Sequence, residues 1–118
     1  MLNQVSLVGR LARDPKTINF EESQKVTLIV AVERNYRNRK GNVDTDFIYV
    51  TAWGRLAEHC SRYLSKGRLI ALRGNIEVDS WDDKETGDKK YRTEVVAQEI
   101  RFLDSVRDSK EDSEVESA

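Results

Sequence analysis

The side chains best suited to holding a ligand are aromatic rings that alternate with aliphatic residues in one short segment. Over residues 46–53, Phe47 and Trp53 occupy odd positions, whereas Ile48 and Val50 occupy even ones. Successive side chains of a strand point to opposite faces. We therefore expect the aliphatic row to face a core and the aromatic row to point outward.

Two further rings, Tyr36 and Trp81, stand at the edges of polar connections over residues 34–46 and 80–90. Bulky rings exposed beside loops call for a function. An aromatic ring can stack on an unpaired nucleobase of any type, for about 1 to 3 kcal/mol per base, while nearby cations neutralise phosphate. This pattern predicts largely sequence-independent binding of unpaired nucleotides, with stacking on Tyr36, Phe47, Trp53 and Trp81.

Basic residues accompany these rings and are the candidate phosphate contacts. They are Arg10, Arg34, Arg37, Arg55, Lys66, Arg73 and Arg92. Taken singly, a surface cation is most often just solvated, and an aromatic residue most often packs in a core or a subunit interface. We prefer this packing interpretation for Phe20, Tyr63 and Phe102, and Tyr49 is balanced between the two readings.

Catalytic groups are scarce. Cys60 and His59 are the only cysteine and histidine, and as neighbours on a predicted helix their side chains diverge by about 100° and cannot pair within the chain. Acid pairs such as Asp82 with Asp83, or Asp44 with Asp46, lie in loops without a histidine or a spaced carboxylate set, and no glycine spacing suits a phosphate loop. We predict no enzyme, metal or cofactor. An enzyme using Cys60 or His59 across a subunit boundary is a remote alternative.

The composition indicates one folded domain with an acidic end. Of 118 residues, 38% are hydrophobic and 35% charged, with 20 bases against 21 acids. Residues 1–103 hold 18 bases and 15 acids, whereas residues 104–118 hold two bases and six acids and almost no apolar side chains. We expect a domain over residues 1–103 and a disordered acidic tail over residues 104–118.

The location of the protein is predicted from what the sequence lacks. A single cysteine cannot form an intrachain disulfide, and the longest apolar run, residues 28–32, is too short for a membrane span or a signal peptide. A cytoplasmic protein without a membrane partner is expected.

Hydrophobic periodicity predicts the elements that position the rings. Strands are expected over residues 4–12, 26–33, 46–53, 69–78 and 91–103, with a hairpin tip at residues 40–42 and a bulge or bend at Gly74. A helix is expected over residues 55–65, between the third and fourth strands, with Gly67 ending it. This order predicts an all-β, five-stranded Greek-key barrel of the oligonucleotide-binding type.

Three sequence segments resemble the bacterial single-stranded DNA-binding protein family over residues 1 to about 103. They are MLNQVSLVGRLARDP, DFIYVTAWGRLAEHCSRYLSKG and YRTEVVAQEIRFLD. The resemblance implies an oligonucleotide-binding fold that assembles as a homotetramer and wraps single-stranded DNA without catalysis, in replication, recombination or repair. The family's stacking positions fall on the same four aromatic residues.

The resemblance also implies self-association through the first strand, at Val5, Leu7, Val8, Gly9 and Arg10. Two features depart from the family pattern. Glu77 and Asp79 stand where relatives tend to carry bases, and acids beside a DNA path repel phosphate. The chain ends in EVESA without a Pro-Phe-like pair, so recruitment of replication or repair proteins is not inferred, and the short tail is similar to that of accessory or mobile-element paralogues.

One alternative function is left open by the residues. A barrel of this type could prefer RNA, or serve mainly as a protein adaptor whose partner covers the aromatic face.

Overall fold

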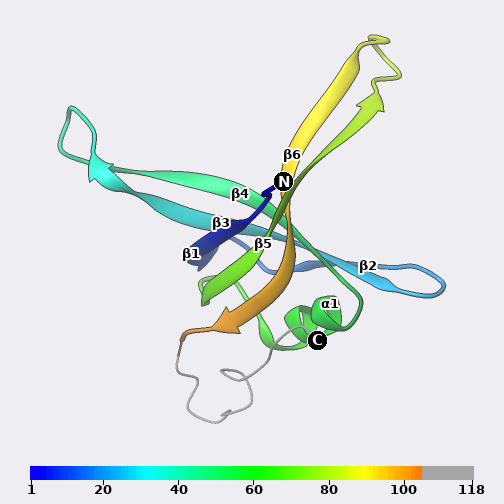
Figure 1. Cartoon of the computed structure of the whole chain (residues 1–118), viewed down its shortest axis with the longest axis horizontal. Helices are drawn as coiled ribbons and strands as arrows, with labels where there is room; N and C mark the ends of the chain where they lie inside the picture. The colour runs from blue at the N-terminus through cyan, green and yellow to red at the C-terminus, as the bar shows by residue number, and fades with distance from the viewer. Residues whose placement is uncertain (105–118) are drawn as a thin grey trace.

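The computed structural model describes residues 1–104, which form six strands and one helix (Figure 1). In chain order these elements are β1 (Val5–Leu11), β2 (Lys16–Asn19), β3 (Gln24–Arg37), β4 (Val43–Trp53), α1 (Gly54–Tyr63), β5 (Leu69–Asp82) and β6 (Lys89–Phe102).

Five of the strands close into a barrel. The sheet order is β1-β5-β6-β4-β3-β2, and β1 also pairs with β3 through Arg10 opposite Ala31 and Leu11 opposite Val30. β4 and β6 run parallel, and the other pairings of the described chain are antiparallel. This is the oligonucleotide-binding topology, so the predicted fold class is confirmed.

The short strand β2 was not predicted, and it changes the strand count. Asp14-Pro15 interrupts the chain after β1, but Lys16–Asn19 then pairs antiparallel with the first residues of β3. The helix therefore follows the fourth strand of the chain, although it still lies between the third and fourth strands of the closed barrel. α1 ends at Tyr63, two residues before the predicted end.

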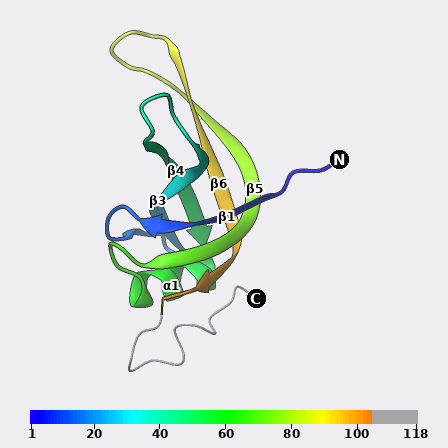
Figure 2. The ribbon, with the colours of Figure 1, turned by 90° about the vertical axis from the view of Figure 1, so that its left-hand side faces the viewer.

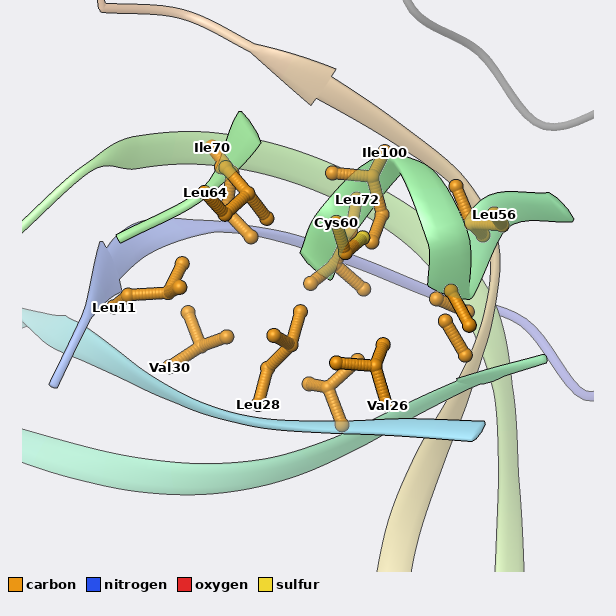
Figure 3. Packing of buried hydrophobic residues seen from close by; sticks show 14 of the residues in the cluster. Leu11, Val26, Leu28, Val30, Leu56, Cys60, Leu64, Ile70, Leu72 and Ile100 are labelled. Atoms are coloured by element: carbon orange, nitrogen blue, oxygen red, sulfur yellow. The ribbon is translucent and has the colours of Figure 1, made fainter. Parts of the chain in front are cut away.

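The core contains the aliphatic row of β4, as the alternation predicted. Val50 and Ala52 are fully buried and pack with Leu28 and Val30 of β3. α1 covers one end of the barrel and adds Leu56, Ala57 and Cys60 to this cluster. Figure 3 shows Val26, Leu28 and Val30 of β3 directed toward Cys60 and Leu72 across the core. This core fixes which face of β4 points away from the barrel.

Two hairpins are longer than predicted and project beyond the barrel (Figure 1). We call residues 33–46 the β3–β4 arm and residues 77–94 the β5–β6 arm. Figure 2 shows α1 at one end of the barrel and the tip of the β5–β6 arm at the other. A register shift at Arg73 and Gly74 gives the predicted bulge at the base of this arm.

Candidate nucleic-acid interface

The aromatic row of β4 points outward. Phe47 is 63% exposed and Trp53 47% exposed, and Tyr49 between them is also exposed. On the neighbouring strand, Ala31 lies opposite Phe47 and Lys25 opposite Trp53. Because Val50 and Ala52 of β4 are buried in the core and Ile48 packs against it, the barrel itself holds Phe47 and Trp53 toward solvent, as the sequence predicted.

Gly54 fixes the place of Trp53 at the end of this row. Its φ of +62° lies in the left-handed region, which a glycine adopts readily and which lets β4 turn at once into α1. Trp53 is therefore the last residue of β4 and directly precedes the first turn of α1.

Trp81 of the β5–β6 arm belongs to the same face. In the register of β5 and β6, Asp79 lies opposite Arg92 and Glu77 opposite Glu94, so these four side chains share the face of Trp81. The Thr51 hydroxyl donates a hydrogen bond of 3.1 Å to Glu94, which links this face to the aromatic row of β4. Trp81 is 48% exposed.

Tyr36 lies on the other side of the β3–β4 arm. Its hydroxyl accepts a hydrogen bond of 3.2 Å from Arg34, whose guanidinium makes two further bonds of 3.0 Å to the Asp46 carboxylate. Asp46 precedes Phe47 in β4, so the two side chains point to opposite faces. The four predicted rings therefore do not form one row, and a DNA strand that touches all four must pass around this arm.

The Arg34–Asp46 ion pair also changes the ionisation of its members. The hydrogen bonds from Arg34 lower the pKa of Asp46 below its ordinary value, and those to Asp46 and Tyr36 raise the pKa of Arg34. Both groups stay charged at neutral pH.

Most of the candidate phosphate contacts are already paired with protein groups. Carboxylates lie 3.0 to 3.4 Å from four of the guanidinium groups, in the pairs Arg10–Asp104, Arg34–Asp46, Arg73–Glu99 and Arg92–Glu94. Arg37 donates to the carbonyl of Gly41 at 2.7 Å. Within residues 1–104, the side chains of Arg55 and Lys66 are exposed and have no hydrogen-bond or ion-pair partner. These two can meet a phosphate without displacing an acid.

Arg92 is held in place by two groups. Its guanidinium carbon lies 5.1 Å from the centre of the Tyr49 ring, and Nη2 lies 3.4 Å from the buried carboxylate of Glu94. Tyr49 therefore supports a cation on the aromatic face, a role that the sequence alone left undecided.

Sequence reasoning missed two residues beside Trp53. Phe20 was expected in a core or an interface, but within the chain it is 51% exposed and outside the core. Its ring stacks on Trp53 with centroids 5.8 Å apart and planes inclined by 26°. Lys25 Nζ lies 5.5 Å from the centre of the Trp53 ring. Only the pairing of β2, β3 and β4 brings these residues together, so periodicity within one strand gave no signal for them.

The packing predicted for the other two aromatic residues is confirmed. Phe102 is buried in the core, and Tyr63 packs against the same cluster with its ring 6.4 Å from that of Phe102.

Several of the groups considered for catalysis are buried or bonded to other protein groups. Cys60 is fully buried, and desolvation raises the pKa of its thiol to about 12. Asp44 accepts a hydrogen bond from Asn38, and Asp46 pairs with Arg34. In the described part of the chain, His, Cys, Asp and Glu residues do not gather in groups of three or more that could hold a metal ion. No helix among residues 1–104 is long and apolar enough to cross a membrane.

Among residues 1–104, one edge of the first strand is largely unpaired. β1 pairs with β5 from Val5 to Arg10, but with β3 only at Arg10 and Leu11. Val8 is exposed, and together with Ser6 and Leu7 it lines a shallow hollow of about 310 Å³. Arg10 donates to the Gly67 carbonyl and to Asp104. Asp104, predicted to begin the tail, is thus anchored to the barrel, and residues 105–118 lie outside the described residues.

The sequence profile of the Single-strand binding protein family matches residues 2–103. The chain is 45% identical over 105 residues to the "Single-stranded DNA-binding protein" of Caldanaerobacter subterraneus subsp. tengcongensis, with 88% of this chain and 69% of that protein covered. It is 36% identical over 110 residues to the "Single-stranded DNA-binding protein 1" of Clostridium acetobutylicum, with 92% and 99% covered.

A solved structure has the same fold. It is a deletion mutant of the single-stranded DNA binding protein from Thermus aquaticus, which is 29% identical and superposes with a TM-score of 0.72. The match covers 88% of this chain and 51% of that chain, so the present chain spans about half of the Thermus protein's length.

Proposed function

Since this chain belongs to the single-strand binding protein family, we propose that it binds single-stranded DNA on the outward face of its barrel. The observation that carries the proposal is the aromatic row of β4, where Phe47 and Trp53 are exposed while the alternate residues fill the core. Stacking on these rings accepts any base. The protein then covers and protects DNA strands exposed during replication, recombination or repair, and it performs no chemistry on them.

The four rings act together in this proposal. Phe47, Trp53 and Trp81 lie on one face and hold the bases of one stretch, and Tyr36 receives the strand where it passes around the β3–β4 arm. Arg55 and Lys66 contact phosphates directly. Arg34 and Arg73 contact phosphates by exchanging their carboxylate partners, because exposed ion pairs are weak and screened by salt. Arg92 contacts phosphate while it keeps its ion pair with the buried Glu94.

We further propose that the chain works as a homotetramer. Edge strands with unpaired backbone groups are templates for pairing with another chain, and β1 offers such an edge from Val5 to Gly9. The exposed Val8 and the hollow beside it supply apolar surface for this contact. Because its proposed ligand is DNA, the protein is expected to act in the cytoplasm, at the nucleoid.

Tryptophan fluorescence tests the DNA-binding proposal, because two of the four rings are tryptophan. Titration with an oligo-dT should quench the emission, and affinity should fall with salt with a log-log slope of about -0.7 per phosphate neutralised. Competition by poly-U measures any preference for RNA. An emission that does not change on addition of oligo-dT would contradict the proposal.

Trp53→Ala should weaken binding by about 1 to 3 kcal/mol, one stacking contribution. Tyr91→Ala is the matched control. Tyr91 is 64% exposed but alternates with Arg92 and so lies on the opposite face of the β5–β6 arm. Equal losses from both variants would show that the aromatic face is not the binding surface. Light scattering with and without the oligonucleotide tests the tetramer on the same samples.

A further inference from the structure

Phe20 stands at a turn that holds it firmly. The Phe20 amide donates a hydrogen bond of 2.8 Å to the carbonyl of Ser23, and the Gln24 side chain donates one of 2.8 Å to the side chain of Asn19. The first bond joins the backbone across the turn between β2 and β3, and the second links the side chains of Asn19 and Gln24, which are paired in the two strands. The ring is therefore displayed by a short hairpin that is part of the sheet.

The stack of Phe20 on Trp53 has no room for a third ring between its two members. Inserting a nucleobase between two rings needs a separation of about 7 Å, twice the optimal carbon–carbon contact distance. The observed centroid distance is 5.8 Å. Bases can therefore join this stack on its two outer faces, one on Trp53 and one on Phe20, and a base enters between the rings only if Phe20 first moves away from Trp53.

The surroundings of Phe20 suit a nucleotide. Lys25 beside the Trp53 ring and Arg55 after it supply positive charge next to the stack. A groove of about 710 Å³ runs between the β2–β3 turn and the start of α1, lined by Ser23, Gln24, Gly54 and Arg55 together with the acids Glu22 and Glu58. In this groove the two acids repel phosphate and Arg55 attracts it, so the backbone of a strand is expected nearest Arg55 and Lys25.

We propose that Phe20 is a fifth base-stacking residue of this protein. A DNA strand that leaves Trp53 continues over the β2–β3 turn, with one base on the outer face of Phe20. The inference rests on the proposed function, because it extends the same binding face by one nucleotide. It also accounts for a large ring exposed on a turn, where water contact is unfavourable.

Variants at position 20 separate stacking from support of Trp53. Phe20→Ala removes both the ring and its contact with Trp53, Phe20→Leu keeps apolar packing without a ring, and Phe20→Tyr keeps the ring. Binding of a dye-labelled oligo-dT should weaken about 5- to 150-fold in the alanine and leucine variants. Phe20→Tyr should bind within about twofold of the original chain, and Tyr91→Ala is again the surface control.

Photo-crosslinking gives direct evidence of contact. With an oligonucleotide carrying 5-bromodeoxyuridine, irradiation and peptide mass spectrometry should find an adduct on Phe20. Thermal unfolding checks that each variant is folded. The crosslink is measured on the unaltered chain, so it does not depend on how well the variants fold.

Several results would overturn the inference. Normal binding by Phe20→Leu would make Phe20 a positioning residue for Trp53, and tighter binding by Phe20→Ala would make it a shield over Trp53. Adducts on Trp53 and Trp81 without one on Phe20 would also reject it. If the unaltered chain does not bind oligo-dT, the proposed function fails, and this inference fails with it.

Discussion

The two arms of the barrel differ in charge although each carries a candidate stacking ring. The β3–β4 arm holds Tyr36 among four bases and three acids, whereas the β5–β6 arm holds Trp81 among four bases and seven acids. On the second arm, Glu77 and Asp79 share the face of Trp81. Stacking depends on the ring, but attraction for the DNA backbone depends on the charge around it.

The comparison teaches that aromatic residues mark where a strand can pass but not how tightly it is held. From these charges we expect the β3–β4 arm to attract phosphate and the β5–β6 arm to repel it. We therefore expect the second arm to close on DNA weakly and to respond most to changes of charge.

The largest expected effect comes from breaking the base of the β5–β6 arm. A Cβ at Gly74 would collide with the backbone oxygen of Val96, so Gly74→Ala must shift β5 against β6. Overpacking of this kind should lower the free energy of unfolding by about 1 to 3 kcal/mol or more, measured by urea denaturation.

Gly87→Ala at the tip of the same arm is the control. Its φ is +76° and a Cβ there would meet nothing within 4 Å, so only the backbone cost of about 1 kcal/mol applies. If Gly74→Ala destabilises the protein no more than Gly87→Ala, the arm does not depend on the bulge.

Reversing the acids of the β5–β6 arm should remove the difference between the arms. The double variant Glu77→Lys with Asp79→Lys places two cations beside Trp81, and we expect about tenfold tighter binding of oligo-dT. The log-log salt slope should steepen by about 1.4, for two additional phosphates neutralised. Affinity is measured across a series of salt concentrations.

Val78→Lys adds a cation to the same arm on its opposite face, because Val78 lies between Glu77 and Asp79 in β5. It should leave the salt slope nearly unchanged. A comparable gain from Val78→Lys would show that net charge, and not the face of Trp81, controls binding.

Releasing Arg34 from its ion pair with Asp46 should increase the charge difference between the two arms. Asp46→Asn removes the carboxylate that binds this guanidinium, so the β3–β4 arm becomes more basic and Arg34 is free for phosphate. We expect binding about threefold tighter, with a salt slope steeper by about 0.7 or less. Weaker binding would mean that the ion pair is needed to hold Tyr36.

The smallest effect concerns pH. The folded-state pKa of Asp46 lies below its ordinary value of 3.8, so its ion pair stabilises the fold above that pH and this contribution is lost as pH falls through the lower value. Urea denaturation of the original chain and of Asp46→Asn should differ near pH 7 and converge toward pH 2. A constant difference would show that Asp46 is not ionised in this pair.

The barrel and the row of Phe47 and Trp53 were predictable because they depend on alternation within one strand. Val50 and Ala52 had to face the core if Phe47 did not, and the structure confirms this. The bulge at Gly74 was also predictable, since glycine interrupts an otherwise regular strand pattern.

Features that depend on contacts between strands were not predictable. Phe20 and Lys25 contact Trp53 only because of the register of three strands. Tyr36 lies on the opposite face of its arm from Phe47, where it bonds to Arg34, which in turn pairs with Asp46. The sequence likewise offered seven cations for phosphate without showing which of them already bind acids. β2 was missed because its four residues are too few to display a period.

The single cysteine offers a measurement of barrel motion that needs no engineering. The thiolate is the form of cysteine that attacks alkylating reagents, and with a pKa of about 12 the Cys60 side chain is almost entirely protonated while it stays enclosed. Its alkylation rate at mild pH therefore reports how often α1 lifts from the strands beneath it. A slower rate in the presence of oligo-dT would reveal that nucleic acid bound on the outside makes the interior more rigid.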